Sequence, residues 1–187
     1  IPRNFRQFNL TMGGRTVPVT GRAGDRPALN MKVAGEGLVI VSHVTTDNKL
    51  TYHEKEKFEA FVEHKNFVGL LARHKERGLP EEGFRELYSR YAKSLMAVGH
   101  GKGSDKRLGL LTEIVAGANP YTDPLSKGLP VQVFYNGKPR SDVQVEVFAK
   151  SPSGKVTITH YKTDKKGRAR VAVKSGYEYL VDSVVMR

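Results

Sequence analysis

Hydrophobic and polar positions alternate with a period of two over the first part of the chain. Thr16-Val17-Pro18-Val19 follows a Gly13-Gly14 turn signal, and Leu38-Val39-Ile40-Val41-Ser42-His43-Val44 is apolar enough for a buried strand. Residues 5–46 are therefore predicted to form strands joined by glycine-containing turns.

The period changes to about 3.6 after residue 51. Thr51-Tyr52-His53-Glu54 fits a capping box, and Phe58, Phe61 and Val62 then form an apolar stripe. A second short helix is expected to end at Gly78-Leu79-Pro80. The third and strongest helix is predicted over residues 81–98, and a flexible polar loop is expected at 99–107. The apolar positions of that third helix are Phe84, Leu87, Tyr88, Tyr91, Leu95 and Val98.

Alternation returns from Leu129 onward, with turn signals such as Asn136-Gly137 between apolar runs. Strands at this spacing are typical of a small sandwich. The predicted fold is therefore mainly β with a helical insertion (α+β), ending in an immunoglobulin-like β-sandwich. We expect an N-terminal β-rich domain over residues 1–120, with its helical insertion at about 52–98, and the sandwich domain over residues 129–187.

The charge of the chain is strongly positive: 31 Lys and Arg against 19 Asp and Glu give a net charge of +12. The positive residues are spread along the chain, which favours a basic solvated surface over a dedicated anion site. The chain has no cysteine, which excludes disulfides and thiolate chemistry. No apolar run approaches the ~20 residues that span a bilayer, so an integral membrane protein is not expected. The one dense basic cluster is Lys162, Lys165, Lys166, Arg168, Arg170 and Lys174.

Two function classes are disfavoured by the motifs. The stretch from Lys166 to Val173 is vaguely similar to an RNA-recognition strand, but arginines occupy the positions of the base-stacking aromatics. Nucleic acid is therefore not the expected partner. No Gly-x-Ser-x-Gly elbow occurs, and the paired glutamates suit helix starts better than acid–base catalysis. We predict no catalytic residues and no enzyme activity.

The six histidines are the candidates for metal ligation. No His-x3-His or His-Glu-x-x-His spacing occurs. His53 and His64 are eleven residues apart, about 16 Å along a helix, so they cannot share one ion. Solvated surface histidines are the simpler interpretation; if a metal binds, His43 and His53 are the ligands predicted here.

The segment Glu86-Leu87-Tyr88-Ser89-Arg90-Tyr91-Ala92-Lys93-Ser94-Leu95 resembles the signature of the NikM-like family of bacterial exported proteins, a domain of unknown function linked to nickel uptake. The resemblance extends to Leu111-Thr112-Glu113-Ile114-Val115 and Asn119-Pro120-Tyr121. It implies a signal peptide and a histidine-containing segment ahead of Ile1, a periplasmic or secreted location, and nickel or cobalt as the metal. A membrane transport complex is the implied partner.

The signature directs attention to four residues. Tyr88 and Tyr91 lie on the apolar face of the predicted helix, which favours a structural role. Arg90 and Lys93 project elsewhere and are expected to meet a partner or the sandwich. The C-terminal part separately resembles carboxypeptidase-regulatory or prealbumin-like modules through Val143, Val145 and Thr163-Asp164-x-x-Gly167.

The function expected from this sequence is that of a non-enzymatic periplasmic accessory binding protein associated with nickel or cobalt uptake. The alternative is a structural or adhesive envelope module that binds anionic polymers or a protein partner through its basic surface.

Overall fold

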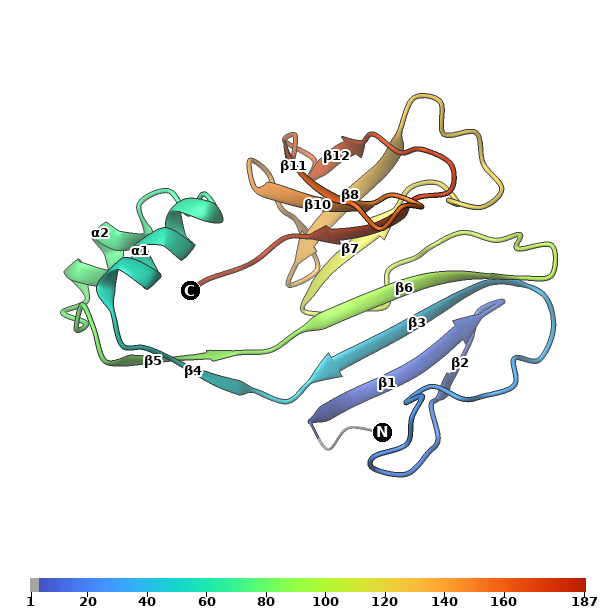
Figure 1. The fold of residues 1–187 in the computed structure, drawn as a ribbon, viewed down its shortest axis with the longest axis horizontal. Helices are drawn as coiled ribbons and strands as arrows, with labels where there is room; N and C mark the ends of the chain where they lie inside the picture. The colour runs from blue at the N-terminus through green and yellow to red at the C-terminus, as the bar shows by residue number, and fades with distance from the viewer. Residues whose placement is uncertain (1–3) are drawn as a thin grey trace. The chain divides into compact units, whose positions relative to one another are not determined.

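The computed structural model describes residues 4–187, which form two compact units (Figure 1). The larger unit runs to Thr46 and resumes from Arg90 to Ser183. The smaller unit comprises Asp47–Ser89 and Val184–Arg187. The domain boundary predicted between residues 120 and 129 lies within the larger unit. The division into an N-terminal domain over residues 1–120 and a sandwich domain over residues 129–187 stays a prediction.

The larger unit begins with an antiparallel sheet in the order β2-β1-β3-β6. The predicted Gly13-Gly14 turn is confirmed: both glycines have positive φ, and they join β1 to β2. Leu10, Val19 and Val39 form the buried core of this sheet. The strands are β1 (Phe5–Met12), β2 (Arg15–Pro18), β3 (Gly37–Thr45) and β6 (Tyr91–Val98).

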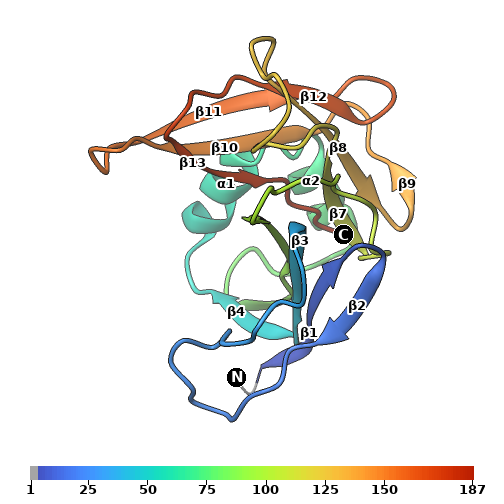
Figure 2. The same ribbon diagram turned by 90° about the vertical axis from the view of Figure 1, so that its right-hand side faces the viewer.

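Two further open sheets of the larger unit share one core. One has the order β12-β8-β7, with β9 paired to β8, and the other has β10 between β11 and β13 (Figure 2). Valines from both sheets form the core, among them Val133 and Val145, which are fully buried. The strands are β7 (Thr112–Ala116), β8 (Leu129–Tyr135), β9 (Lys138–Pro139), β10 (Gln144–Lys150), β11 (Val156–Lys162), β12 (Arg168–Val171) and β13 (Glu178–Asp182).

The smaller unit is a two-stranded ribbon with two short helices. Its core is aromatic: Tyr52, Phe58 and Phe84 have ring centroids 4.9–5.2 Å apart. Val62 and Leu70 complete the buried cluster. The elements are β4 (Asn48–Tyr52), α1 (Lys55–His64), α2 (Leu70–Glu76) and β5 (Phe84–Tyr88).

The helix predicted over residues 81–98 is wrong, and the helical insertion is correspondingly small. That segment forms β5 and β6, and β6 pairs with β3 from Gly37 opposite Val98 to Val44 opposite Tyr91. Pairing with the strongly apolar β3 overrides the local helical spacing. The capping box is also wrong, because Thr51 and Tyr52 belong to β4 and Glu54 precedes α1 without a side-chain cap. The two helices therefore span only residues 55–76 of the predicted 52–98.

The Glu86 carboxylate is poorly solvated within the smaller unit. Its Oε2 atom is buried and has no hydrogen-bond partner in residues 4–187. Burial raises the pKa of Glu86, and the hydrogen bond to the Tyr52 hydroxyl lowers it by less. The same burial and the nearby carboxylate raise the pKa of Tyr52. Glu86 therefore holds its proton more tightly in the folded protein than an exposed glutamate does.

Replacing Glu86 by glutamine is expected to stabilise the protein at neutral pH. A carboxyl whose pKa is higher in the folded than in the unfolded state makes stability fall as pH rises from its ordinary value of 4.5 through the folded value. Glutamine does not ionise, so the variant should lack this loss of stability. Urea unfolding at pH 4 and pH 7.5 measures the free energy of unfolding of both proteins, with the exposed Glu82→Gln as control. Equal stability of wild type and Glu86→Gln at pH 7.5 would contradict the prediction.

Candidate metal centre

His43 lies on β3 within an aromatic cluster of the larger unit. Its imidazole stacks on Phe5 at 5.0 Å between ring centroids and meets the edge of Phe8 at 6.3 Å. Burial, and then the positive charge of Arg90, lower the pKa of His43 below its ordinary value. These contacts give His43 a packing role in the sheet.

His53 lies between β4 and α1 in the smaller unit, and its side chain is exposed. Neither His43 nor His53 belongs to any converging group of three or more His, Asp or Glu ligand atoms in residues 4–187. Metal binding by these two histidines remains a prediction that no contact in the described chain supports.

The four signature residues lie at the end of β5, in the connection that follows and in the first part of β6. Tyr88 ends β5 opposite Asn48, and Tyr91 begins β6 opposite Val44. The backbone N–H of Arg90 donates to Thr45 Oγ1 at 2.9 Å. Lys93 alternates onto the same face of β6 as Tyr91 and Leu95.

Lys93 forms a buried ionic network in the larger unit. Its Nζ atom lies 2.7 Å from Asp105 Oδ1 and 3.1 Å from Glu113 Oε1, and it donates to the carbonyl of Lys106 at 2.8 Å. The three charged side chains are at most 7% exposed. Lys93 is thus held inside the unit and is not presented to an external partner.

Backbone donors satisfy the remaining carboxylate oxygens of this network. Glu113 accepts N–H bonds from Leu108 at 2.7 Å and from Gly109 at 3.2 Å, and Asp105 accepts one from Ala116 at 2.8 Å. A set of charges compensated in this way is typical of a structural ion network rather than of a reactive centre.

Residues 99–107 form the predicted polar loop, but hydrogen bonds hold it in place. The buried Asn119 side-chain amide donates to the carbonyls of Gly101 and Gly103 at 2.9 and 2.8 Å. The carbonyl of Lys102 accepts the N–H of Leu38 at 2.8 Å. The segment is irregular in conformation but is fixed by hydrogen bonds from distant residues.

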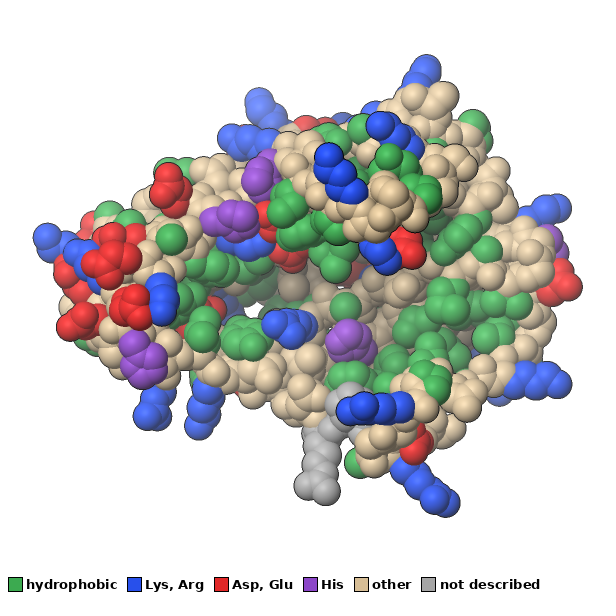
Figure 3. Space-filling view, in the orientation of Figure 1, with side chains coloured by type: hydrophobic (Ala, Val, Ile, Leu, Met, Phe, Trp, Pro, Cys, Tyr) green, Lys and Arg blue, Asp and Glu red, His purple; other side chains and the backbone are tan. Residues whose placement is uncertain are grey.

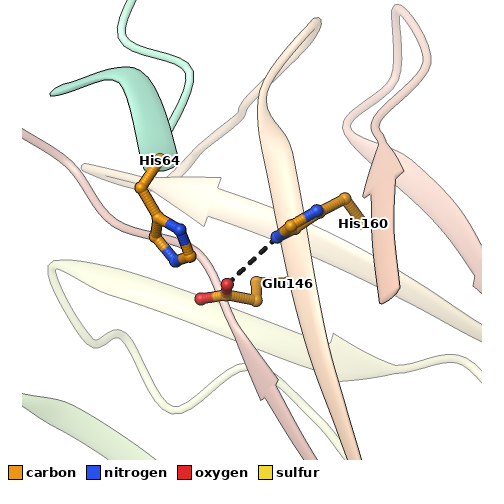
Figure 4. Close-up of side chains that lie close together, drawn as sticks. All are labelled: His64, Glu146 and His160. Atoms are coloured by element: carbon orange, nitrogen blue, oxygen red, sulfur yellow. Dashed lines mark hydrogen bonds and ion pairs between the residues drawn. The ribbon is translucent and has the colours of Figure 1, made fainter. Parts of the chain in front are cut away.

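The arrangement best suited to bind an ion lies on the three-stranded sheet. The His160 Nε2 atom on β11 lies 3.0 Å from Glu146 Oε1 on β10 (Figure 4). Glu146 is opposite His160 on one side and Asp182 of β13 on the other, so the three residues form one row across the sheet. Val145 and Val147 point into the core, which places this row on the opposite face.

The chemistry of this row suits a transition-metal ion. Imidazole nitrogen and carboxylate oxygen are ligands that nickel, cobalt and zinc accept. The His160 side chain is 46% exposed, which gives an ion access, whereas that of Glu146 is 2% exposed. Asp182 lies opposite Glu146 on β13 and adds a second carboxylate to the same row.

The sequence analysis missed the Glu146–His160 pair, although a local signal for it exists. Pro152-Ser153-Gly154 is a three-residue hairpin loop whose glycine has a φ of 85°. Such a loop sets Lys150 opposite Val156, and counting back along both strands places Glu146 opposite His160. The register of this hairpin could therefore have identified the pair.

The positive charge of the molecule is distributed rather than concentrated. Figure 3 shows Lys and Arg side chains spread over the visible face, with acidic side chains gathered over the two helices. Within the basic cluster, Asp164 pairs with Arg168 at 2.9 Å, and hydrogen bonds from Arg168 lower the pKa of Asp164. Asp142 lies 3.4 Å from Lys162. These carboxylates neutralise part of the cluster.

Within residues 4–187, neither helix has the length and apolar character needed to cross a membrane. Comparison with curated proteins found no match, and comparison with solved structures found none either. Residues 2–187 match a family described as a domain of unknown function, DUF4198. Because this match covers nearly the whole chain, the protein belongs to the DUF4198 family.

Proposed function

We propose that this protein is a non-enzymatic periplasmic accessory protein that binds nickel or cobalt through Glu146 and His160. The observation that carries the proposal is the 3.0 Å approach of an imidazole nitrogen to a carboxylate oxygen on neighbouring strands. Two adjacent strands of a sheet hold these ligand atoms, which limits the entropy lost when an ion binds.

Several parts of this proposal derive from the sequence resemblance. The NikM-like identity, the signal peptide and the partnership with a membrane transport complex are proposed on that ground. The prealbumin-like, immunoglobulin-like nature of the last sheets is proposed with them, supported by the shared valine core of two sheets. Metal binding has additional support from the short distance between the Glu146 and His160 ligand atoms.

We expect isothermal titration calorimetry with Ni²⁺, Co²⁺ and Zn²⁺ to detect binding to the wild-type chain. His160→Ala and Glu146→Gln should each weaken it at least about tenfold, equivalent to about 1.4 kcal/mol of binding free energy. Binding should also weaken at acidic pH, because a ligating imidazole must be neutral.

His43→Ala and His53→Ala are the matched controls, since they remove the same side chain elsewhere. Both should bind the ions as the wild type does. Full binding by His160→Ala with loss in His43→Ala or His53→Ala would move the site to those residues and contradict the assignment to Glu146 and His160.

The second candidate function is attachment to an anionic envelope polymer through the basic residues at and around the turn between β11 and β12. The cluster of lysines and arginines between Lys162 and Lys174 favours it. Binding of this kind should decrease steeply between low and physiological salt, because exposed charges are screened. Retention on an anionic resin that is unaffected by added salt would exclude it.

A further inference from the structure

We propose that a second copy of this chain completes the metal site by pairing along the edge strand β11. This inference rests on the proposed function, because it assigns the remaining ligands of the same site. Within the larger unit taken by itself, Glu146 and His160 supply two converging ligand atoms. Structural transition-metal sites usually have about four ligands, so the two from this unit leave coordination positions for ligands from elsewhere.

The edge formed by β11 has the properties that permit pairing with another strand. β11 pairs with β10 over seven residues without a bulge, and no strand in residues 4–187 pairs with its other side. Residues 156–161 contain no Lys, Arg, Asp, Glu, Pro or Gly, and nearly all of β11 is exposed. Natural sheets usually protect such edges with charges, prolines or bulges.

Three other edge strands of the larger unit carry the protection that β11 lacks. β2 has only four residues and ends at Pro18. β12 also has four and carries Arg168 and Arg170. β13 carries Glu178 and Asp182 at its two ends. β11 is thus a long, regular edge with uncharged residues along most of its length, next to an incomplete ligand set.

Antiparallel pairing of two β11 strands about His160 would bring the two half-sites together. Each His160 would face its counterpart, with Cβ atoms about 5 Å apart as in directly opposed sheet neighbours. Because Glu146 already lies opposite His160 on β10, the joined sheets would present two imidazoles and two carboxylates in one row. This ligand set suits a nickel, cobalt or zinc ion.

The same register opposes no like charges along the strand. Ile158 would face Lys162 of the second copy, and Thr159 would face Tyr161. Both pairs occur twice because the arrangement is symmetric. Ile158 is therefore a suitable position at which to test this register by substitution. Its side chain is 52% exposed and does not contribute to the buried core of either sheet.

Sedimentation equilibrium of the full chain during titration with Ni²⁺ tests the proposal. We expect a monomer without metal and a dimer with it, and one ion bound per two chains. A chelator should restore the monomer. His160→Ala should remain monomeric at every Ni²⁺ concentration.

Two substitutions at Ile158 test whether dimer formation depends on pairing along β11 as well as on metal ligation by His160. Ile158→Lys places like charges opposite Lys162 at both symmetric positions, and should weaken the metal-linked dimer at least about tenfold. Ile158→Glu removes the same apolar side chain but faces Lys162 with an opposite charge, and should retain the dimer. Circular dichroism spectra of both variants should match that of the wild type, since the position is exposed.

The outcomes distinguish this inference from the function on which it rests. One Ni²⁺ bound per chain by a protein that stays monomeric would overturn the edge pairing and leave the metal-binding function intact. Equal dimerisation of Ile158→Lys and Ile158→Glu would overturn pairing through β11. An absence of Ni²⁺, Co²⁺ and Zn²⁺ binding would overturn both proposals.

Discussion

Lys93→Ala is expected to lower the free energy of unfolding by about 3–5 kcal/mol, because it removes one partner from a buried ionic network. The substitution leaves the carboxylates of Asp105 and Glu113 in the interior without their cation, and both side chains are at most 3% exposed. Desolvated charges that lose their counter-charge are among the most destabilising changes in a protein.

Urea unfolding followed by circular dichroism measures this effect. Lys155→Ala is the control, because Lys155 is exposed in the loop between β10 and β11. Adding Glu113→Gln to Lys93→Ala should recover part of the lost stability, because it removes one of the two buried carboxylates that Lys93→Ala leaves without a cation. A cost of less than about 1 kcal/mol for Lys93→Ala would mean that the network behaves like a surface ion pair.

Gly167→Ala is expected to cost about 2–4 kcal/mol, from backbone strain and steric overlap combined. Gly167 has a φ of 72°, which favours glycine. A Cβ atom there would lie 2.8 Å from the carbonyl oxygen of Val133 and 2.9 Å from the backbone nitrogen of Arg140. Both are backbone atoms in or beside β8 and β9, so neither can rotate away as a side chain could.

Gly154→Ala separates the two contributions to this cost. Gly154 has a φ of 85°, and a Cβ atom there would meet nothing within 4 Å. It should cost only about 1 kcal/mol, which is the backbone contribution. Chemical denaturation of both variants makes the comparison. Equal costs at the two positions would show that close packing around Gly167 contributes nothing.

The strands from β8 to β13, apart from the two-residue β9, could be predicted from the sequence because their signals are local. Alternation of Val131 with Val133, and of Val145 with Val147, places these valines in the core. Turn residues such as Asn136-Gly137 then separate the strands, and both have positive φ in the structure. Each strand carries its own period, so its existence does not depend on knowing its partner.

Residues 84–98 could not be assigned in this way, because the decisive information lies in another segment. The spacing of Tyr88, Tyr91, Leu95 and Val98 fits a helix face, yet Leu38–Val44 of β3 needs a neighbouring strand for its backbone groups. Lys93 illustrates the consequence: on a helix it would lie on the polar face, whereas on β6 it faces inward and meets Asp105 and Glu113.

The two polar arrangements differ in how far the sequence could reveal them. Glu146 and His160 belong to one hairpin, so its loop length determines their pairing. Lys93, Asp105 and Glu113 come from a strand, an irregular segment and a second strand of another sheet. No local rule relates their positions, and only the assembled fold brings their charges together.

The insertion point of the smaller unit has a consequence for how this family can vary. The chain leaves β3 after Thr45 and returns at Arg90, and these two residues are joined by a backbone hydrogen bond of 3.0 Å from Thr45 N to the Arg90 carbonyl. A short turn could therefore connect β3 to β6 directly without disturbing their pairing. Segments of very different length could replace residues 47–89 during evolution or by design, while the sheets that hold Glu146 and His160 keep their own connections.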